Sequence, residues 1–413
     1  MNRHPRRVIA LTVVGILMAG LAAGGGWWLG QRGDRQPAAS GVTTAPPITQ
    51  PAPTTAPATP TSRERVGTWQ RLPATPIPNG SYEFSGVWTG RELLLYGAVH
   101  DPEQRPRAAG AAYNPATNTW RKLPPAPGPV ENAEGGYTAV WTGTELLGGG
   151  LGLNAAYNPA TNRWRRLPRW GDRNAVTVWT GRLLLTWGGG CCDDFVAGGG
   201  AYNPATNTWR QLPQGPLAGR HTTGAWTGAE LIVAGGTGSD AHGNVAGYKT
   251  FADAAAYNPT TDTWRRLPPM PEPRTNATAT WTGTEVLVVG GRDTGRHYAD
   301  GVAYNPATNR WRRLPAMESN RIGHTATWTG NQLLIWGGQT RRAGSWTAPA
   351  HGLAYDPASN RWSPLPESPL RGRTGHVAVW TGTQMLIWGG GPARESDTQR
   401  HFNDGAAYTP YPM

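Results

Sequence analysis

Cysteine is almost absent from the 413-residue sequence, which holds two, Cys191 and Cys192, side by side. Their spacing matches no structural zinc site, and we expect neither a bound metal nor a cofactor. Thiols in an oxidising compartment are usually paired, so the sequence predicts a disulfide between these neighbours. Adjacent Cα atoms lie about 3.8 Å apart, below the usual range for a disulfide, so this bond would be strained.

Acidic residues and helical patterns are scarce as well. Asp and Glu total 26 against 38 Lys and Arg, which leaves a formal charge of +12, and nearly all the basic residues are Arg. In the repeated part of the chain, the apolar runs are short, aromatic and β-branched, and they are bounded by Gly, Pro and Asn. With 57 Gly and 38 Pro, the composition predicts an all-β fold that is rich in turns.

Three sequence features recur in a fixed order. A Tyr stands seven residues before a Trp, that Trp opens a W-x-x-L-P string, and a Trp-Thr-Gly triplet leads into an apolar run that ends in glycines. The triplets begin at Trp88, Trp141, Trp179, Trp226, Trp281, Trp328 and Trp380. They lie on average about 49 residues apart, a spacing typical of repeat architectures.

Each repeat divides into four short strands, a to d. Strand a ends in Trp-Thr-Gly, strand b ends at the glycines, strand c ends in the Tyr, and strand d begins with the next Trp. Four-stranded antiparallel units in tandem predict a β-propeller. The array starts with a lone strand d at Trp69 and ends with strands a, b and c up to Tyr408. We therefore predict seven blades, with the N-terminal strand pairing with the last blade and leaving no open edge.

The Gly pair, the Tyr and the Trp seven residues later resemble the kelch motif. The pattern is similar to the kelch propellers of galactose oxidase and of bacterial sialic-acid epimerases, and it covers roughly Arg63 to the C-terminus. The copper site of galactose oxidase needs a Tyr cross-linked to a Cys, and two adjacent cysteines on one loop do not fit it. The resemblance to the epimerases implies an alternative, an enzyme that acts on anionic sugars.

The N-terminal part predicts export and attachment to a membrane. Residues 1–7 are basic and form a cytoplasmic tail, and residues 8–30 hold 23 uncharged positions, enough for a transmembrane signal anchor. A cleaved signal peptide is the alternative. Residues 31–62 form a disordered Pro/Thr/Ala-rich linker, and residues 63–413 form the propeller outside the cytoplasm.

The variable connections between blades carry the candidate site. Arg274, Arg321 and Arg373 each lie seven residues before a Trp-Thr-Gly triplet, and strand a lines the channel of a propeller. We expect them at the channel mouth, where converging Arg side chains would bind an anion. The same group includes Arg220, His221 and His297, and the weak catalytic candidates are His324 and His376. The alternative is local polar pairing that orders the loop entries.

Strand d predicts a second basic feature on the outer rim. The two positions after its Trp are mostly Arg, and charge on an outermost strand discourages edge pairing between molecules or attracts anionic polymers. Together these features predict a membrane-anchored binding module for an envelope glycan or an extracytoplasmic protein, with no nucleic-acid partner. An enzyme on anionic sugars and a purely structural spacer are the alternatives.

Overall fold

The computed structural model describes residues 67–78, 84–100, 106–127, 138–149, 154–169, 174–191, 194–238, 249–342, 344–393 and 401–411. The tail, the membrane helix and the linker predicted for residues 1–62 lie outside these ranges, as do Cys192 and the side chain of Cys191. In the described ranges, no helix is long and apolar enough to span a membrane. The disulfide and the anchor therefore stay predictions.

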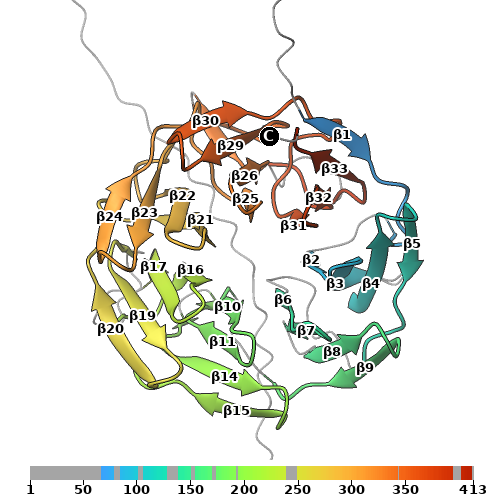
Figure 1. Cartoon of the computed structure of the whole chain (residues 1–413), viewed down its shortest axis with the longest axis horizontal. Coiled ribbons are helices and arrows are strands. Elements are labelled where there is room, and N and C mark those ends of the chain that lie inside the picture. Colours follow the sequence, from blue (N-terminus) through green and yellow to red (C-terminus); the bar gives the residue numbers. More distant parts are fainter. Residues whose placement is uncertain are drawn as a thin grey trace, which may run out of the picture. The chain divides into compact units, whose positions relative to one another are not determined.

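Seven antiparallel sheets stand in a ring, and each sheet is one blade (Figure 1). Blades I and II contain β2 (Phe84–Trp88), β3 (Leu93–His100), β4 (Pro106–Asn114) and β5 (Thr119–Lys122), then β6 (Thr138–Trp141), β7 (Leu146–Gly149), β8 (Ala155–Asn158) and β9 (Arg163–Arg166). Blades III and IV contain β10 (Val176–Trp179), β11 (Leu184–Trp187), β14 (Gly199–Asn203) and β15 (Thr208–Gln211), then β16 (His221–Trp226), β17 (Leu231–Gly238), β19 (Ala254–Asn258) and β20 (Thr263–Leu267).

The remaining blades follow the same order. Blades V and VI contain β21 (Thr275–Trp281), β22 (Val286–Arg292), β23 (Gly301–Asn305) and β24 (Arg310–Arg313), then β25 (Thr325–Trp328), β26 (Leu333–Trp336), β29 (Gly352–Asp356) and β30 (Arg361–Pro364). Blade VII contains β31 (Val377–Trp380), β32 (Met385–Trp388), β33 (Gly405–Thr409) and β1 (Thr68–Arg71). The short strands β12 (Gly190–Cys191), β13 (Asp194–Phe195), β18 (Lys249–Thr250), β27 (Thr340–Arg342) and β28 (Ser345–Thr347) lie in connections.

Blade VII is built from both ends of the propeller. Strand β1 pairs antiparallel with β33, with Trp69 opposite Tyr408, and the two rings lie 5.0 Å apart. In the other six blades, the Tyr of strand c meets the Trp of strand d in the same register, for example Tyr304 opposite Trp311. The N-terminal strand thus supplies the outer strand of the last blade, the closure that the sequence predicts.

The repeated turns account for the constant spacing of the motifs. The c–d turn ends in an Asn or Asp with a positive φ, such as Asn309 at 54°, a backbone region that Asn tolerates. Tyr304 donates its hydroxyl to the side chain of Asn309 at 2.8 Å, which ties the turn to strand c. In the a–b turn, Gly283 takes a φ of 99° after the Trp-Thr pair. Because these local contacts fix both turns, the number of residues in each turn does not vary between blades.

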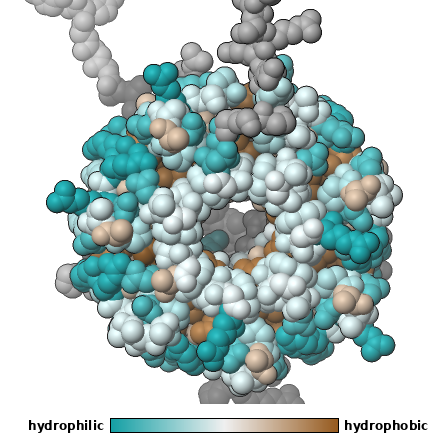
Figure 2. All heavy atoms as spheres, viewed as in Figure 1, coloured by the Kyte–Doolittle hydropathy of each residue, from teal (hydrophilic) through white to brown (hydrophobic). Residues whose placement is uncertain are grey.

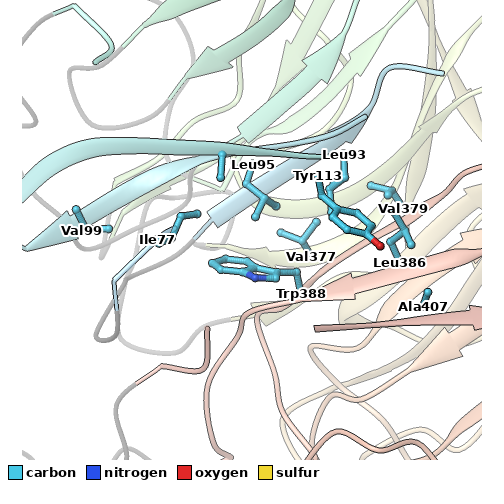
Figure 3. Packing of buried hydrophobic residues seen from close by; sticks show 11 residues of the cluster. Ile77, Leu93, Leu95, Val99, Tyr113, Val377, Val379, Leu386, Trp388 and Ala407 are labelled. Atoms are coloured by element: carbon cyan, nitrogen blue, oxygen red, sulfur yellow. The ribbon is translucent and has the colours of Figure 1, made fainter. Parts of the chain in front are cut away.

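Apolar side chains fill the space between neighbouring blades. At the closing junction, Trp388 and Leu386 of blade VII pack against Leu93 and Leu95 of blade I (Figure 3). The strand-d Trp also reaches the preceding blade, since Trp120 donates its indole N–H to the carbonyl of Pro73 at 3.0 Å. The W-x-x-L-P string therefore supplies both members of a contact between blades. Figure 2 shows the blades in a ring around a central opening.

Arginines of the outer rim are tied to the blades. Arg121 follows a strand-d Trp and makes a two-point ion pair with Glu92 in the a–b turn of its own blade, at 3.0 and 2.7 Å. Its Nη1 donates to the hydroxyl of Tyr157 in the next blade at 2.9 Å. The equivalent ion pairs are Arg165–Glu145, Arg265–Glu230 and Arg312–Glu285. Charge at these rim positions is thus balanced within each of these blades.

In most blades, the two members of this ion pair are either both present or both absent. Blades that have Glu four residues after the triplet Trp also have Arg after the strand-d Trp. In blade VI the two positions hold Gln332 and Ser363, and in blade VII they hold Gln384 and Gln70. In these two blades both charges are absent. Blade III is the exception, since Arg210 follows its strand-d Trp while Leu183 stands at the Glu position, and Arg210 pairs with Asp262 of the next blade.

Candidate functional site at the channel mouth

Four of the predicted site arginines occupy one equivalent position, just before the innermost strand of blades IV to VII. They are Arg220, Arg274, Arg321 and Arg373, and each is at most 1% exposed. Their guanidinium groups turn into their own blade and donate to the carbonyl of the first glycine after strand b. Arg274 reaches Gly290 at 3.0 Å and Arg373 reaches Gly389 at 2.9 Å. These donors therefore hold the end of strand b.

Three of these arginines also meet a carboxylate that stands directly before strand c. Arg274 Nη2 lies 2.6 Å from Asp300 Oδ1, Arg373 Nη1 lies 2.7 Å from Asp404 Oδ1, and Arg220 pairs with Asp253. An aromatic ring covers each guanidinium: Phe251 at 3.8 Å, Tyr298 at 4.1 Å and Phe402 at 4.4 Å. Ion pairing and cation–π contact together compensate the charge of these buried cations, although Arg274 Nε and Arg373 Nη2 make no hydrogen bond to the described residues.

Arg321 of blade VI lacks that carboxylate because His351 stands where the other blades have Asp. Its Nη1 donates to the carbonyls of Gly337 and His351, at 3.2 and 3.0 Å. Glu318 Oε1 lies 3.5 Å from Nη2, and neither Nη2 nor Nε makes a hydrogen bond to the described residues. Burial lowers the pKa of Arg321 to about 10, so the group stays charged at pH 7 with incomplete compensation.

The two candidate catalytic histidines are buried between blades. His324 Nε2 lies 3.0 Å from Thr278 Oγ1, and His376 Nε2 lies 2.8 Å from Thr325 Oγ1, so each ring joins its own blade to the preceding one. Burial lowers the pKa of both to about 3, and the buried Arg321 and Arg373 add to the shift. Both histidines are neutral near pH 7, each hydrogen-bonded through Nε2 to a threonine.

The other two predicted histidines lie nearer the surface. His221 Nε2 is 2.9 Å from the carbonyl oxygen of Gly190, and its ring meets Phe195 edge-on at 5.1 Å. His297 in blade V packs edge-on against Trp346 of the β27–β28 hairpin, at 5.0 Å. Burial lowers the pKa of His297, and two nearby arginines add to the effect. Both histidines thus join one blade to the next.

A pocket of about 370 Å³ opens at the variable end of the channel, where strands a of blades III, IV and V begin. Polar side chains dominate its lining, among them Asn174, His221, Thr222 and Asn276. Asn174 and Asn276 have φ values of 60° and 56°, and both side chains are exposed. Outside the c–d turns, they are the two non-glycine residues with positive φ in the described ranges. Such positions are worth functional attention.

The backbone of blade IV is adjusted at the same place. Strand β16 changes register between His221 and Thr223, an irregularity of the kind that re-aims side chains beside functional sites. Thr222 turns its hydroxyl to the carbonyls of Ala234 and Gly235, at 2.9 and 3.1 Å. The exposed amides of Asn174 and Asn276 thus flank a fixed polar wall.

In a comparison with protein-family models, residues 273–318 match the kelch motif. This range begins just before Arg274 and contains all of β21, β22, β23 and β24, which is one complete blade. The other blades repeat its strand order and its paired Tyr and Trp. The chain is a kelch-repeat β-propeller. A search of curated proteins finds no match to it.

The contacts of the buried arginines agree with the second interpretation of the sequence, in which these residues form local polar pairs that order the loop entries. Binding of an external anion by Arg274, Arg321 and Arg373 stays a prediction, but guanidinium groups this deeply buried would have to leave their partners to reach a ligand. The Asp partners had a signal in the sequence, an aromatic-x-Asp string before strand c. It occurs at Phe251, Tyr298 and Phe402.

Sequence reasoning missed the two asparagines of the pocket. Asn174 and Asn276 stand five residues before the triplet Trp, where blades VI and VII have Gly323 and Gly375 with φ values of 62° and 64°. An Asn in a position that otherwise takes Gly is the available signal. In the described part of this kelch propeller, no three His, Cys, Asp or Glu side chains lie together as a metal site would need.

Proposed function

We infer that this kelch propeller is an interaction module that binds a glycan of the cell envelope at the channel mouth, held outside the cytoplasm by the membrane segment predicted at residues 8–30. The observation that carries the inference is the open polar pocket between blades III, IV and V. Pockets of roughly 300 to 1,000 Å³ accommodate small ligands. A volume of about 370 Å³ suits one or two sugar units.

The chemistry of the lining favours a hydroxyl-rich ligand. An Asn amide both donates and accepts hydrogen bonds, as a sugar hydroxyl does, and Asn174 and Asn276 present exposed amides on two sides of the pocket. Both residues have a backbone in the left-handed region, and Asn276 Oδ1 accepts a hydrogen bond from the hydroxyl of Thr275 at 3.0 Å. The backbone that carries the two amides is therefore set before the ligand arrives, which lowers the entropic cost of binding.

A catalytic role in anionic sugar chemistry has less support. A general acid or base works best with a pKa near the working pH, and burial takes His324 and His376 far below it. Three of the four arginines that would hold a carboxylate, Arg220, Arg274 and Arg373, are engaged with Asp253, Asp300 and Asp404. These contacts make binding without turnover the better-supported function.

Replacement of the two pocket asparagines tests the proposal. The double variant N174G/N276G removes both amides and keeps a residue that adopts positive φ freely. Loss of two hydrogen bonds should weaken binding to envelope oligosaccharides by roughly tenfold or more, measured by titration calorimetry on ligands found with a glycan array. N309G, at a positive φ in the c–d turn of blade V, is the matched control and should bind normally. Equal affinity of the double variant and the wild type would refute this site, and absence of glycan binding would refute the function.

A further inference from the structure

The face that carries the a–b and c–d turns has grooves at the junctions between blades. Grooves of about 530, 330 and 350 Å³ lie between blades I and II, II and III, and VII and I. In each, one wall is the a–b turn of one blade, and the other is the triplet Trp and the c–d turn of the next. The three tryptophans are Trp141, Trp179 and Trp88. One arrangement thus occurs three times. It is built from the a–b and c–d turns, whereas the channel-mouth pocket is built from the other ends of the strands a.

Each groove combines a flat apolar wall with a polar rim. The triplet Trp is partly buried, and beside it lie the Pro and the exposed Ala of the c–d turn, such as Pro159 and Ala160. The groove between blades II and III has the hydroxyls of Thr142 and Thr144 on the facing turn. Partly exposed aromatic surface beside hydroxyls fits a ligand that is apolar on one face and hydroxylated at its edge, which describes a sugar ring.

Charged side chains line all three grooves, and Arg91 lines two of them. In the groove between blades I and II, Arg121 and Glu92 form a two-point ion pair and satisfy each other. The groove between blades II and III has Glu145 and Arg182, and Glu145 pairs with Arg165. In the groove between blades VII and I, Arg91 is the one charged lining residue, so charge alone does not select a neutral ligand, and the apolar wall and the hydroxyls are what favour a sugar.

The groove walls are rigid. Thr142 accepts a hydrogen bond from the backbone N–H of Glu145 at 2.9 Å and donates its hydroxyl to the carbonyl of the same residue at 3.1 Å. On the other wall, Ala205 donates its N–H to the side chain of Asn203 at 3.0 Å. A ligand therefore enters a preformed site without ordering a loop, which keeps the entropic cost of binding low.

We propose that these grooves bind sugar units of one polysaccharide, so that the propeller is a multivalent glycan-binding ring on its turn face. The triplet Trp is partly buried at its equivalent position in all seven blades. One weak site repeated on a rigid ring gains avidity for a polymer without tight binding of any single unit. The proposal uses other residues than the channel-mouth pocket and stands or falls separately from it.

Plugging the grooves with large side chains tests the proposal. Ala116, Ala160 and Ala205 are exposed and line one groove each, so A116R/A160R/A205R should fold normally and fill all three. The control T161R/T206R/T308R adds the same charge to the same kind of turn, at exposed positions that line none of the three grooves. The probes are a glucan, a mannan and an arabinogalactan, and the readouts are tryptophan fluorescence and surface-immobilised binding of the full chain.

The wild type should bind at least one of these polymers, with tryptophan fluorescence changing on binding. The groove variant should lose about tenfold or more in apparent affinity, each single plug less than about threefold, and the control should match the wild type. Failure to bind any of the three polymers, or equal binding by the groove variant, would overturn the proposal. Binding of a proline-rich peptide that the plugs abolish, with no binding of polysaccharide, would also overturn it and assign the grooves to a protein partner. N174G/N276G should leave this binding unchanged, which separates the two sites.

Discussion

Buried arginines hold parts of blades IV to VII together through the contacts that compensate their charge. Arg220, Arg274, Arg321 and Arg373 have almost no exposed surface. A buried cation without partners would cost several kcal/mol, so each is surrounded by carbonyl oxygens, and three meet a carboxylate and an aromatic ring. The set ties the start of strand a to the loop before strand c. The predicted ligand contacts therefore also hold the blade together.

The Asp partners should matter more than any rim ion pair. D300A leaves the charge of Arg274 buried with weakened compensation, and we expect a loss of about 3 kcal/mol in the free energy of unfolding. E285Q removes the partner of the half-exposed Arg312 and should cost less than about 1 kcal/mol. H351D gives Arg321 the carboxylate present in three other blades and should add about 1 kcal/mol. Urea unfolding of the three variants measures these differences, and equal losses in D300A and E285Q would contradict the assigned roles.

The buried histidines predict a pH dependence of stability. His324 and His376 have a folded-state pKa of about 3, below the ordinary value of 6.5 that applies to the unfolded chain. Between these values the unfolded state binds more protons, so stability is fully present above pH 6.5 and falls as the pH drops toward 3. Each histidine should remove on the order of 1 kcal/mol per pH unit below 6.5.

The double variant H324Q/H376Q should show a flatter curve. Urea unfolding at pH 7 and at pH 5 should reveal a smaller loss of stability in the variant than in the wild type. Identical pH dependence in both proteins would show that these rings do not resist protonation in the folded state.

At the scale of elements, the repeat explains what the sequence could and could not predict. Strands, turns and the pairing of Trp69 with Tyr408 follow from fixed local spacings, because each turn is set by residues within it. The position of the Arg274 side chain depends on its ion pair with Asp300, which lies 26 residues away across a connection of variable length. The pocket depends on the backbone angles of Asn174 and Asn276. Contacts across variable loops and between blades are therefore the part that one sequence does not specify.

Strand β1 gives the sharpest test at this scale. Deleting residues 63–73 removes the outer strand of blade VII and exposes the hydrogen-bonding edge of β33 together with part of the core around Trp336 and Tyr408. We expect a lower melting temperature and a tendency of the truncated propeller to associate through the open edge. Differential scanning calorimetry and size-exclusion chromatography measure both. An unchanged melting temperature would mean that the ring does not need this closure.

The whole molecule divides its surface between two kinds of site. The variable end of the channel carries one polar pocket built by blades III, IV and V, and the turn face carries grooves repeated by the blade symmetry. The first site depends on residues that break the repeat, such as Asn174 and Asn276, whereas the second depends on residues that obey it. The two proposed sites would thus combine selective binding at one face with avidity at the other.

Hydrogen exchange by mass spectrometry on the propeller, with and without a soluble envelope glycan that it binds, tests the central claim of channel-mouth recognition most directly. Binding should slow exchange of backbone amides in residues 174–178, 221–224 and 275–278, which surround the pocket, because the ligand excludes water and restricts local opening there. The strand-d amides around Arg265 and Arg312 on the outer rim should exchange as before. Unchanged exchange in the three pocket segments at saturating glycan would contradict the account.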